Sequence, residues 1–519
     1  MPVNPFLNKV TFLKGNGGLG GQGVGSDYIS GLLYYDVNTG YTPSAAYNVF
    51  LSPADAIAAG YTPLTDETKA IYESAIGKGS TGDVISIYML DPLGNEILLC
   101  TYTQTAGDST DTLLAASLAA AINAALTGFT ATNTAANLFV TMPAGYGMYP
   151  NANPGTNMTA TITGAITFGT PTNSTPGVAS INSQIYYQVS EYFRLNPSGQ
   201  LYFGYIKKAS ATITFTEIQT LQGNANGAIR QIGIYVPVPN SIASSASVVA
   251  TEIVTYANTI NAICATLEGL KTPLSALLGV NCYNLSTPSS LTNLNTLTDN
   301  FVTVIMLQDG NAQGNYLFQT SQVSSTSVGA ALGAVSFSYV NECIAAPSKF
   351  NLSNGVELSV PAYANGVKYV INDTTSGLLD SYAYVYGGLY PDYQGTYFNN
   401  SYTACPQTND YSFIELNRVI DKAIRLINAA FTPLIAIPLI LNPAGTLQAK
   451  DVAKLQAAVI DALNPMLAPG AGRVPEASGV TVTIDPAQNI LSTGTLTVGV
   501  AITPDAIARK FTVPIQYQA

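Results

Sequence analysis

The 519-residue sequence contains no histidine and no tryptophan. The missing histidine excludes Ser-His-Asp and Cys-His catalysis, together with histidine-ligated metal sites. The five cysteines are far apart and include no C-x-x-C pair. We therefore expect buried free thiols rather than a disulfide framework.

Charged residues are also scarce. They make up 9% of the sequence, against roughly 25% in an ordinary soluble domain, and the net charge is −11. Nucleic-acid binding needs a basic surface, and the sequence offers none. A weakly charged surface favours association, so we interpret the chain as a component of an assembly, although an ordinary extracellular or viral β-rich protein would have a similar composition.

Long apolar runs are missing as well. The longest, residues 426–441, contains Pro433 and Pro438 and falls short of the ~20 residues that a spanning helix needs. The N-terminal residues lack the charged and apolar regions of a signal peptide. We expect no signal peptide and no direct membrane insertion.

Two glycine-rich segments match nucleotide-binding patterns only formally. Gly15, Gly17 and Gly20 have the G-x-G-x-x-G spacing, but a strand-like segment follows them where the fingerprint requires a helix. Within residues 77–81, Gly79 occupies the place where a P-loop needs Ser or Thr. We predict no catalytic, cofactor-binding or metal-binding residues, and no enzymatic activity. A glycosidase using two of the 30 acidic residues stays open as an alternative.

Residues 409–519 have the clearest local pattern. Ser412 and Glu415 form an S-x-x-E capping box, and the apolar spacing that follows predicts a helix ending at Pro433. Asp421 and Arg425 are spaced as an exposed ion pair on this helix. The charged residues expected on its polar side are Arg418, Asp421, Lys422 and Arg425.

The rest of this region reads as a second helix over 446–464, two half-buried strands at 480–484 and 496–502, and a short helix starting at 503–505. A last strand over 511–519 has an apolar face, and its Pro514 suits an edge or added strand. Such a strand usually has a pairing partner, which another subunit could supply, and a strand-like segment at 10–13 looks like an N-terminal arm. The arm residues are Val10, Phe12, Leu13, Phe511, Val513, Ile515 and Tyr517.

Upstream, the pattern alternates between strands and helices. Central strands are predicted at 27–36, 201–206, 231–236 and 301–307, with helices at 52–60, 247–267 and 327–344. A hairpin at 84–89 and 96–102, a helix at 113–126 and a strand at 138–142 suggest an inserted β-rich module. A tyrosine-rich segment, 382–402, suits either an interface or a packed internal loop.

Together these elements predict a mixed α/β, multi-domain fold of the α+β class. The predicted parts are an N-terminal arm and glycine-rich joint (1–25), a central α/β body (26–82 and 171–360), a surface-exposed β-rich module (83–170), a C-terminal domain (361–510) and a C-terminal arm strand (511–519).

Several segments together resemble the tail sheath proteins of contractile phages and related injection systems. The segments that carry the resemblance are 17–20 with 27–33, 112–145, 327–333 through 350–352, 395–400, 409–411 and 417–423. They are short signatures spread over most of the chain rather than a catalytic motif.

The resemblance implies a structural subunit that forms hexameric rings, stacked helically around an inner tube, and contracts to drive the tube through a cell envelope. It implies arms that add strands to neighbouring subunits. Its implied partners are an inner tail tube protein and baseplate and tail terminator proteins, in a virion tail assembled in the host cytoplasm.

Because the C-terminal domain faces inward in that family, Arg418, Lys422 and Arg425 become candidates for tube contact, with a solvated helix face as the alternative. No ATP site is evident, so contraction would draw on free energy stored at assembly. A non-contractile viral or S-layer-like lattice protein is the alternative function.

Overall fold

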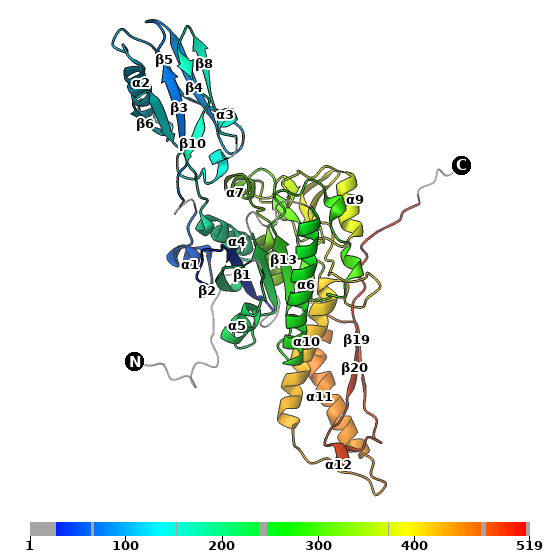
Figure 1. Ribbon diagram of the computed structural model, residues 1–519. Coiled ribbons are helices and arrows are strands. Elements are labelled where there is room, and N and C mark those ends of the chain that lie inside the picture. The colour runs from blue at the N-terminus through cyan, green and yellow to red at the C-terminus, as the bar shows by residue number, and fades with distance from the viewer. Residues whose placement is uncertain are drawn as a thin grey trace, which may run out of the picture.

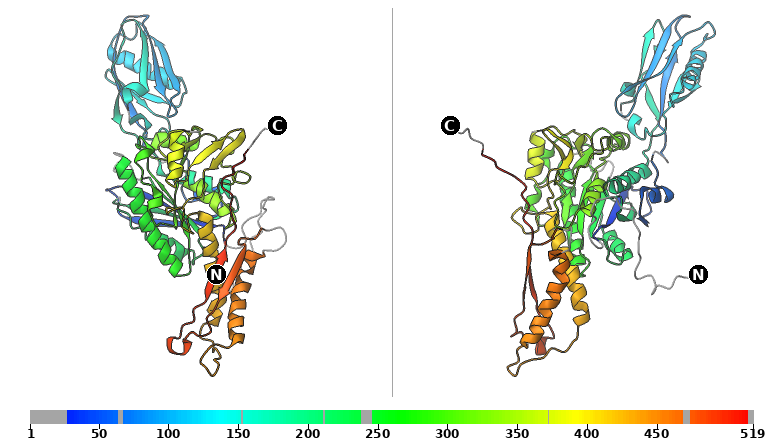
Figure 2. Two further views of the ribbon diagram at one scale, coloured as in Figure 1. Left: turned by 90° about the vertical axis from the view of Figure 1, so that its right-hand side faces the viewer. Right: turned by 180° about the vertical axis from the view of Figure 1, so that it is seen from behind.

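The computed structural model describes residues 27–63, 67–151, 153–210, 212–237, 246–371, 373–468 and 474–514. Three parts lie along an elongated molecule: an α/β body in the middle, a β-rich module at one end and a helical C-terminal unit at the other (Figures 1 and 2). The predicted multi-domain α+β fold is confirmed.

The body is built on a six-stranded sheet in the order β14-β13-β12-β1-β11-β2. All neighbours are parallel except β2, which runs antiparallel to β11. The sequences of parallel strands that are covered on both faces are continuous apolar runs. In agreement with this, every residue of β12 and β13 is buried. The strands are β1 (Ile29–Val37), β2 (Ser44–Phe50), β11 (Gln200–Lys208), β12 (Gln231–Val236), β13 (Ser275–Val280) and β14 (Val302–Val304).

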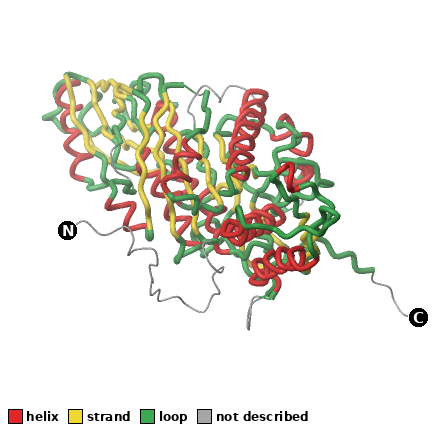
Figure 3. The backbone as a smooth tube through the Cα atoms, turned by 90° about the horizontal axis from the view of Figure 1, so that it is seen from below, coloured by secondary structure: helices red, strands yellow, loops and turns green. Residues whose placement is uncertain are grey.

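Helices flank the sheet, as a view from below shows (Figure 3). On one face α8 packs so closely that a Cβ at Gly233 would lie 2.9 Å from Val328. On the other, a Cβ at Gly31 would lie 3.1 Å from Leu221 of α5. The body helices are α1 (Pro53–Ala58), α4 (Ile181–Leu195), α5 (Glu217–Asn224), α6 (Ala246–Gly269), α7 (Gln313–Ser321), α8 (Val328–Phe337) and α9 (Thr374–Ser381).

Two small antiparallel sheets complete the body. The predicted strand at 301–307 is divided between β14 and β15 (Leu307–Asp309), and β15 pairs with β16 (Pro361–Tyr363). The tyrosine-rich segment contains the β17 (Gly387–Tyr390) and β18 (Tyr393–Phe398) hairpin. The hydrophobic core of the body extends to Ile414, whereas the sequence placed the start of the C-terminal domain at residue 361.

The module has its own hydrophobic core, from Ala70 to Ile166. The predicted hairpin and helix are present as β4–β5 and α2. Strand β3 pairs with β7, β9 and β10, so the module's sheets begin before residue 83. Its strands are β3 (Ile71–Gly77), β4 (Val84–Leu90), β5 (Glu96–Thr103), β6 (Thr130–Thr134), β7 (Asn137–Thr141), β8 (Met158–Thr163), β9 (Thr167–Phe168) and β10 (Thr172–Thr175), and its helices are α2 (Asp111–Ala124) and α3 (Pro154–Asn157).

The C-terminal unit packs two helices against a β-hairpin. It consists of α10 (Ile414–Phe431), α11 (Ala449–Leu467), β19 (Gly479–Thr483), α12 (Ile490–Thr493) and β20 (Gly499–Thr503). Helix α11 continues through Pro465, where the sequence predicted an end, because Met466 is buried in the core of the unit. A proline in the last turn costs less than one in mid-helix, since few hydrogen bonds remain to be lost.

Candidate functional site: a charge network around helix α10

Helix α10 connects the body to the C-terminal unit, and its charged side faces inward. Arg418, Asp421 and Lys422 are buried, whereas Leu416 and Ile420 of the predicted apolar stripe are half-buried. Buried charges cost free energy unless they are paired and hydrogen-bonded. The orientation of α10 therefore depends on partners from elsewhere in the fold.

Lys422 lies at the centre of the network. Its ammonium nitrogen is 2.7 Å from Oδ2 of Asp27 and 2.6 Å from Oε2 of Glu476. The guanidinium of Arg425 is 3.1 Å from Oδ1 of the same Asp27. Burial raises the pKa of Glu476, and the charge of Lys422 opposes that shift. One lysine thus joins the start of β1, helix α10 and the segment that leads into β19.

Arg418 binds the end of a helix rather than an acid. Its guanidinium donates to the Ser338 hydroxyl at 2.7 Å and to the carbonyl oxygens of Tyr339 and Ser338 at 3.1 and 3.3 Å. Ser338 is the C-cap of α8, where free carbonyl groups attract cations. Burial lowers the pKa of Arg418. These bonds hold α10 against the C-terminal end of α8.

The predicted capping box of Ser412 and Glu415 is not formed. Helix α10 takes Phe413 as its N-cap, and Glu415 points into the body. There it accepts a hydrogen bond from Ser401 at 2.7 Å and forms an ion pair with Arg509. The Arg509 guanidinium lies 3.5 Å from the centre of the Phe413 ring, so the C-terminal segment is fixed to the first turn of α10.

The helix predicted to start at 503–505 is also absent, because its cap and its first-turn acid are used elsewhere. Thr503 is the last residue of β20. The Asp505 carboxylate accepts hydrogen bonds from Asn341 at 2.9 Å and from Ser478 at 2.6 Å. Residues 504–514 have no regular secondary structure; they pass the edge of the body and then extend away from it (Figure 1).

Of the predicted arm residues, the structure describes Phe511 and Val513. Phe511 and Val513 are 81% and 71% exposed and belong to no strand of this chain. The predicted arm residues outside the described ranges are Val10, Phe12, Leu13, Ile515 and Tyr517.

The candidate tube-facing residues lie inside the subunit. Arg418 and Lys422 are 3% and 9% exposed. In this subunit their side chains therefore face neither a tube nor solvent. Arg425 contacts Asp27 instead of forming the predicted exposed pair with Asp421. Sequence reasoning missed Asp27 because it is 398 positions away from Arg425, and no local pattern links residues so far apart.

An open groove of about 680 Å³ separates α10 from β20. Leu416 and Ile420 line one side, and Val500 and Ile502 line the other. Among the described residues β20 pairs with β19 alone. The apolar stripe of α10 thus borders a groove next to a hairpin with unpaired edges.

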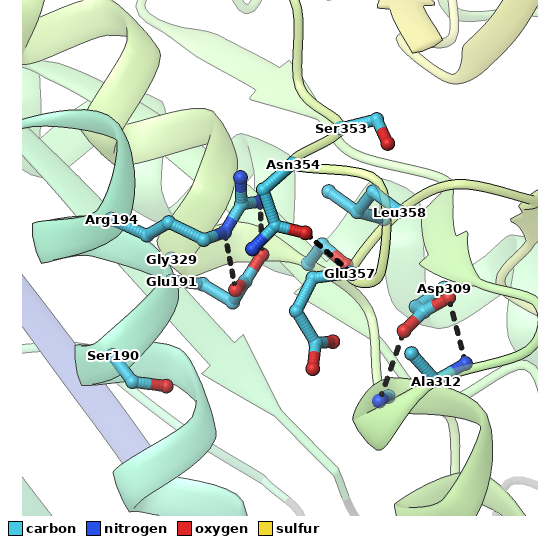
Figure 4. A network of polar contacts seen from close by, with 12 residues as sticks. Ser190, Glu191, Arg194, Asp309, Ala312, Gly329, Ser353, Asn354, Glu357 and Leu358 are labelled. Atoms are coloured by element: carbon cyan, nitrogen blue, oxygen red, sulfur yellow. Dashed lines mark hydrogen bonds and ion pairs between the residues drawn. The ribbon is translucent and has the colours of Figure 1, made fainter. Parts of the chain in front are cut away.

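A second polar network lies in the body, where α4, α7 and the loop around Glu357 meet (Figure 4). Arg194 binds both carboxylate oxygens of Glu191, at 2.8 and 2.6 Å. Asp309 accepts hydrogen bonds from backbone N–H groups before α7, at 3.1 and 3.2 Å. Burial, followed by the nearby Asp309 and Glu191, raises the pKa of Glu357 to about 7.

This network does not present two carboxylates to a substrate. Asp309 and Glu191 are 0% and 2% exposed, and each is held by fixed donors. A glycosidase needs a pair of carboxyl groups that flank the bond to be cleaved. Of these three acids, Glu357 alone is more than marginally accessible, so the arrangement is that of a structural junction.

The backbone donors of the P-loop-like segment are occupied, and the described residues contain no cluster that would hold a metal through three acidic ligands. In the P-loop-like segment, the backbone N–H groups of Lys78, Gly79 and Ser80 already donate to side chains of Asp111, Gln104 and Asp83. No group of three or more Cys, Asp or Glu side chains is placed to hold a metal within the described ranges. All five cysteines are buried and free. Within those ranges, no helix is long and apolar enough to cross a membrane.

Residues 410–519 match the family model described as DUF2586, C-terminal domain. This match covers α10, α11 and the β19–β20 hairpin. No curated protein matches the chain.

Among solved structures, the chain is similar to one in the cryo-EM structure of the anti-feeding prophage (AFP) baseplate, 6-fold symmetrised. The TM-score is 0.43 with 14% sequence identity, over 66% of this chain and 82% of that chain. So remote a likeness assigns neither fold nor function.

Proposed function

We propose that the protein is a structural subunit of a contractile tail sheath, without enzymatic activity. It polymerises as helically stacked hexameric rings around an inner tube. On triggering, the polymer contracts and drives the tube through the envelope of a target cell. Its partners are other copies of the chain, the tube protein, and baseplate and tail terminator proteins of the virion tail.

The observation that carries the proposal is an unpaired β-hairpin next to a segment that leaves the subunit. Hairpin β19–β20 has free edges among the described residues, and an apolar groove lies beside β20. Free strand edges are templates for pairing with another chain. The segment after Arg509 exposes Phe511 and Val513, which suits a strand that adds to a neighbouring hairpin.

The sparse charge supports the same role. A chain with 9% charged residues gains little from colloidal repulsion. The resemblance to sheath proteins noted in the sequence favours a sheath over other assemblies. A non-contractile lattice protein would share the free hairpin but would form flat sheets.

Electron microscopy of the purified full chain tests the proposal. Tubes or stacked rings that form as the protein concentration rises are the expected result. Flat sheets would favour the lattice alternative. A chain that stays monomeric at high concentration by light scattering would contradict both.

A further inference from the structure

The contacts of Lys422, Arg425 and Arg418 do not explain why Asp421, another charged residue of α10, is buried. It is 3% exposed, and its Oδ2 atom has no hydrogen-bond partner. The ion pairs around it, among the described residues, go to Asp27 and Glu476 instead. A buried carboxylate oxygen without a partner commonly marks a bound water or ion.

Asp421 borders a polar cavity of about 230 Å³ between the last turn of α6 and the first half of α10. The C-terminal end of α6 approaches α10 here, since Glu268 and Asn417 line the same cavity (Figure 1). The other polar residues of the lining are Glu268, Asn300, Tyr411 and Asn417. The cavity therefore brings together two carboxylates, two side-chain amides and a phenol.

Hydrogen bonds already orient one of the amides. Nδ2 of Asn417 donates to the carbonyl oxygens of Tyr411 and Phe413, at 2.9 and 3.2 Å. Its Oδ1 has a single long contact, 3.4 Å, with Nδ2 of Asn300. The Asn417 oxygen thus keeps the capacity to bind a further positive group.

Burial and the surrounding charged groups together set the protonation of Asp421. Burial raises the pKa of Asp421 to about 7; Glu268 adds to the shift, and Arg425, Arg418 and Arg230 oppose it. Arg425 and Arg418 are held by Asp27 and by the end of α8. They cannot turn into the cavity without giving up those contacts.

We propose that this cavity binds a hard divalent cation, Ca²⁺ in preference to Mg²⁺, through the carboxylates of Asp421 and Glu268 and the amide oxygens of Asn300 and Asn417. Calcium accepts six to eight oxygen ligands in irregular geometry, whereas magnesium demands a near-ideal octahedron. The cavity has room for waters that complete the shell, since each occupies about 30 Å³ in the liquid. With two carboxylates, the affinity falls in the weak range of about 10⁻⁴–10⁻³ M.

The consequence would be mechanical, and it goes beyond the proposed function. Glu268 belongs to the last turn of α6, and Asn300 precedes β14; both belong to the body. Asp421 and Asn417 belong to α10. A bound cation therefore ties the C-terminal unit to the body at a second point, separate from Lys422.

Terbium luminescence on the full chain provides the test. Tb³⁺ occupies calcium sites and emits when a nearby tyrosine is excited, and the chain contains no tryptophan to interfere. The expected results are a saturable Tb³⁺ emission displaced by Ca²⁺ and a higher Tm in millimolar Ca²⁺. Asp421→Asn and Glu268→Gln should each weaken binding at least tenfold. Tyr411→Phe should lower the emission while the rise in Tm with Ca²⁺ persists.

Asp461→Asn, on the exposed face of α11, is the matched control and should behave as wild type. If Asp421→Asn does not fold, Glu268→Gln provides the test of binding. Glu268 is only half-buried, so this substitution should leave the fold intact. The proposal is overturned if wild type shows no Ca²⁺-displaced emission and no rise in Tm, which would mean a cavity that holds water. It is equally overturned if both carboxylate variants bind like wild type, which would mean ions at other sites.

Discussion

Glu357 is a carboxyl group held next to other negative groups. Asp309 faces it from the end of β15, and Glu191, Arg194 and Tyr187 face it from α4. Arg194 is already bound to Glu191, so burial and the neighbouring acids dominate and raise the pKa of Glu357 from 4.5 to about 7. The folded state thus favours the protonated acid at a pH where the unfolded chain ionises it.

The sign of the pH dependence follows from this shift. An acid with a raised pKa contributes stability that is complete below its unfolded pKa and is lost as pH rises through its folded pKa. As pH rises from about 5 to about 8, we expect wild type to lose more unfolding free energy than Glu357→Gln does. The difference between the two losses should be on the order of 1–3 kcal/mol. Urea denaturation at several pH values measures the difference in unfolding free energy between the two proteins.

Glu96→Gln is the control for this prediction, because Glu96 is exposed at the start of β5. Its difference from wild type should not change with pH. A difference between Glu357→Gln and wild type that is constant from pH 5 to 8 would mean that Glu357 is ionised throughout, and the assigned shift would be wrong.

At the scale of elements, strands were easier to predict than the orientation of helices. Strands β1, β11 and β12 follow from short apolar runs, because parallel strands are covered on both faces. Helix α4 was missed because its buried side includes Gln184, Gln188 and Glu191. Gln188, for example, bonds the backbone of Gly329 and Thr326 across the contact with α8, and no periodicity of the sequence indicates such a polar contact.

Helix α10 shows the limit most clearly. Its existence was predictable from apolar spacing. In its first half, however, charged side chains are buried while Leu416 and Ile420 border a groove, whereas Ile427 and Phe431 pack inward as expected. The charges of Lys422 and Arg425 are compensated by Asp27, which lies at the other end of the chain. The candidate site could not be assembled from the sequence, because each of its contacts joins segments that only the fold brings together.

The docking of α10 can be tested at Lys422. Lys422→Met keeps an apolar stem but removes the ammonium group that forms ion pairs with both Glu476 and Asp27. Removing one partner of a buried ion pair costs about 3–5 kcal/mol, so α10 should open more readily. Hydrogen–deuterium exchange of peptides from α10 should show faster exchange, while the module strands, which have a separate core, keep their rates.

Two further variants separate charge from packing. Lys454→Met, on the exposed side of α11, should change stability by less than about 0.5 kcal/mol. Adding Glu476→Gln to Lys422→Met should recover part of the loss, because it removes the uncompensated charge. Equal exchange in Lys422→Met and Lys454→Met would show that the network does not hold α10 in place.

For the whole molecule, the central question is how the segment after Arg509 is used. Residues 504–509 are fixed to the body by Asp505 and Arg509. Beyond them the described part of the segment makes no strand contact, and its apolar side chains are exposed. The free hairpin β19–β20 belongs to the same chain, so copies of the subunit would supply both the segment and its acceptor.

Deleting residues 511–519 separates folding from assembly. The exposed Phe511 and Val513 contribute little to the core, so we expect the Tm of the dilute subunit to change by no more than a surface substitution would cause. Polymers seen by electron microscopy should be lost.

Leu491→Ser, which removes an apolar side chain that is 86% exposed at α12, is the control for a general loss of surface hydrophobicity. Polymers that persist after the deletion would refute the role of the segment. A large fall in Tm would instead show that it packs within its own subunit, because a strand needed only between subunits leaves the isolated fold intact.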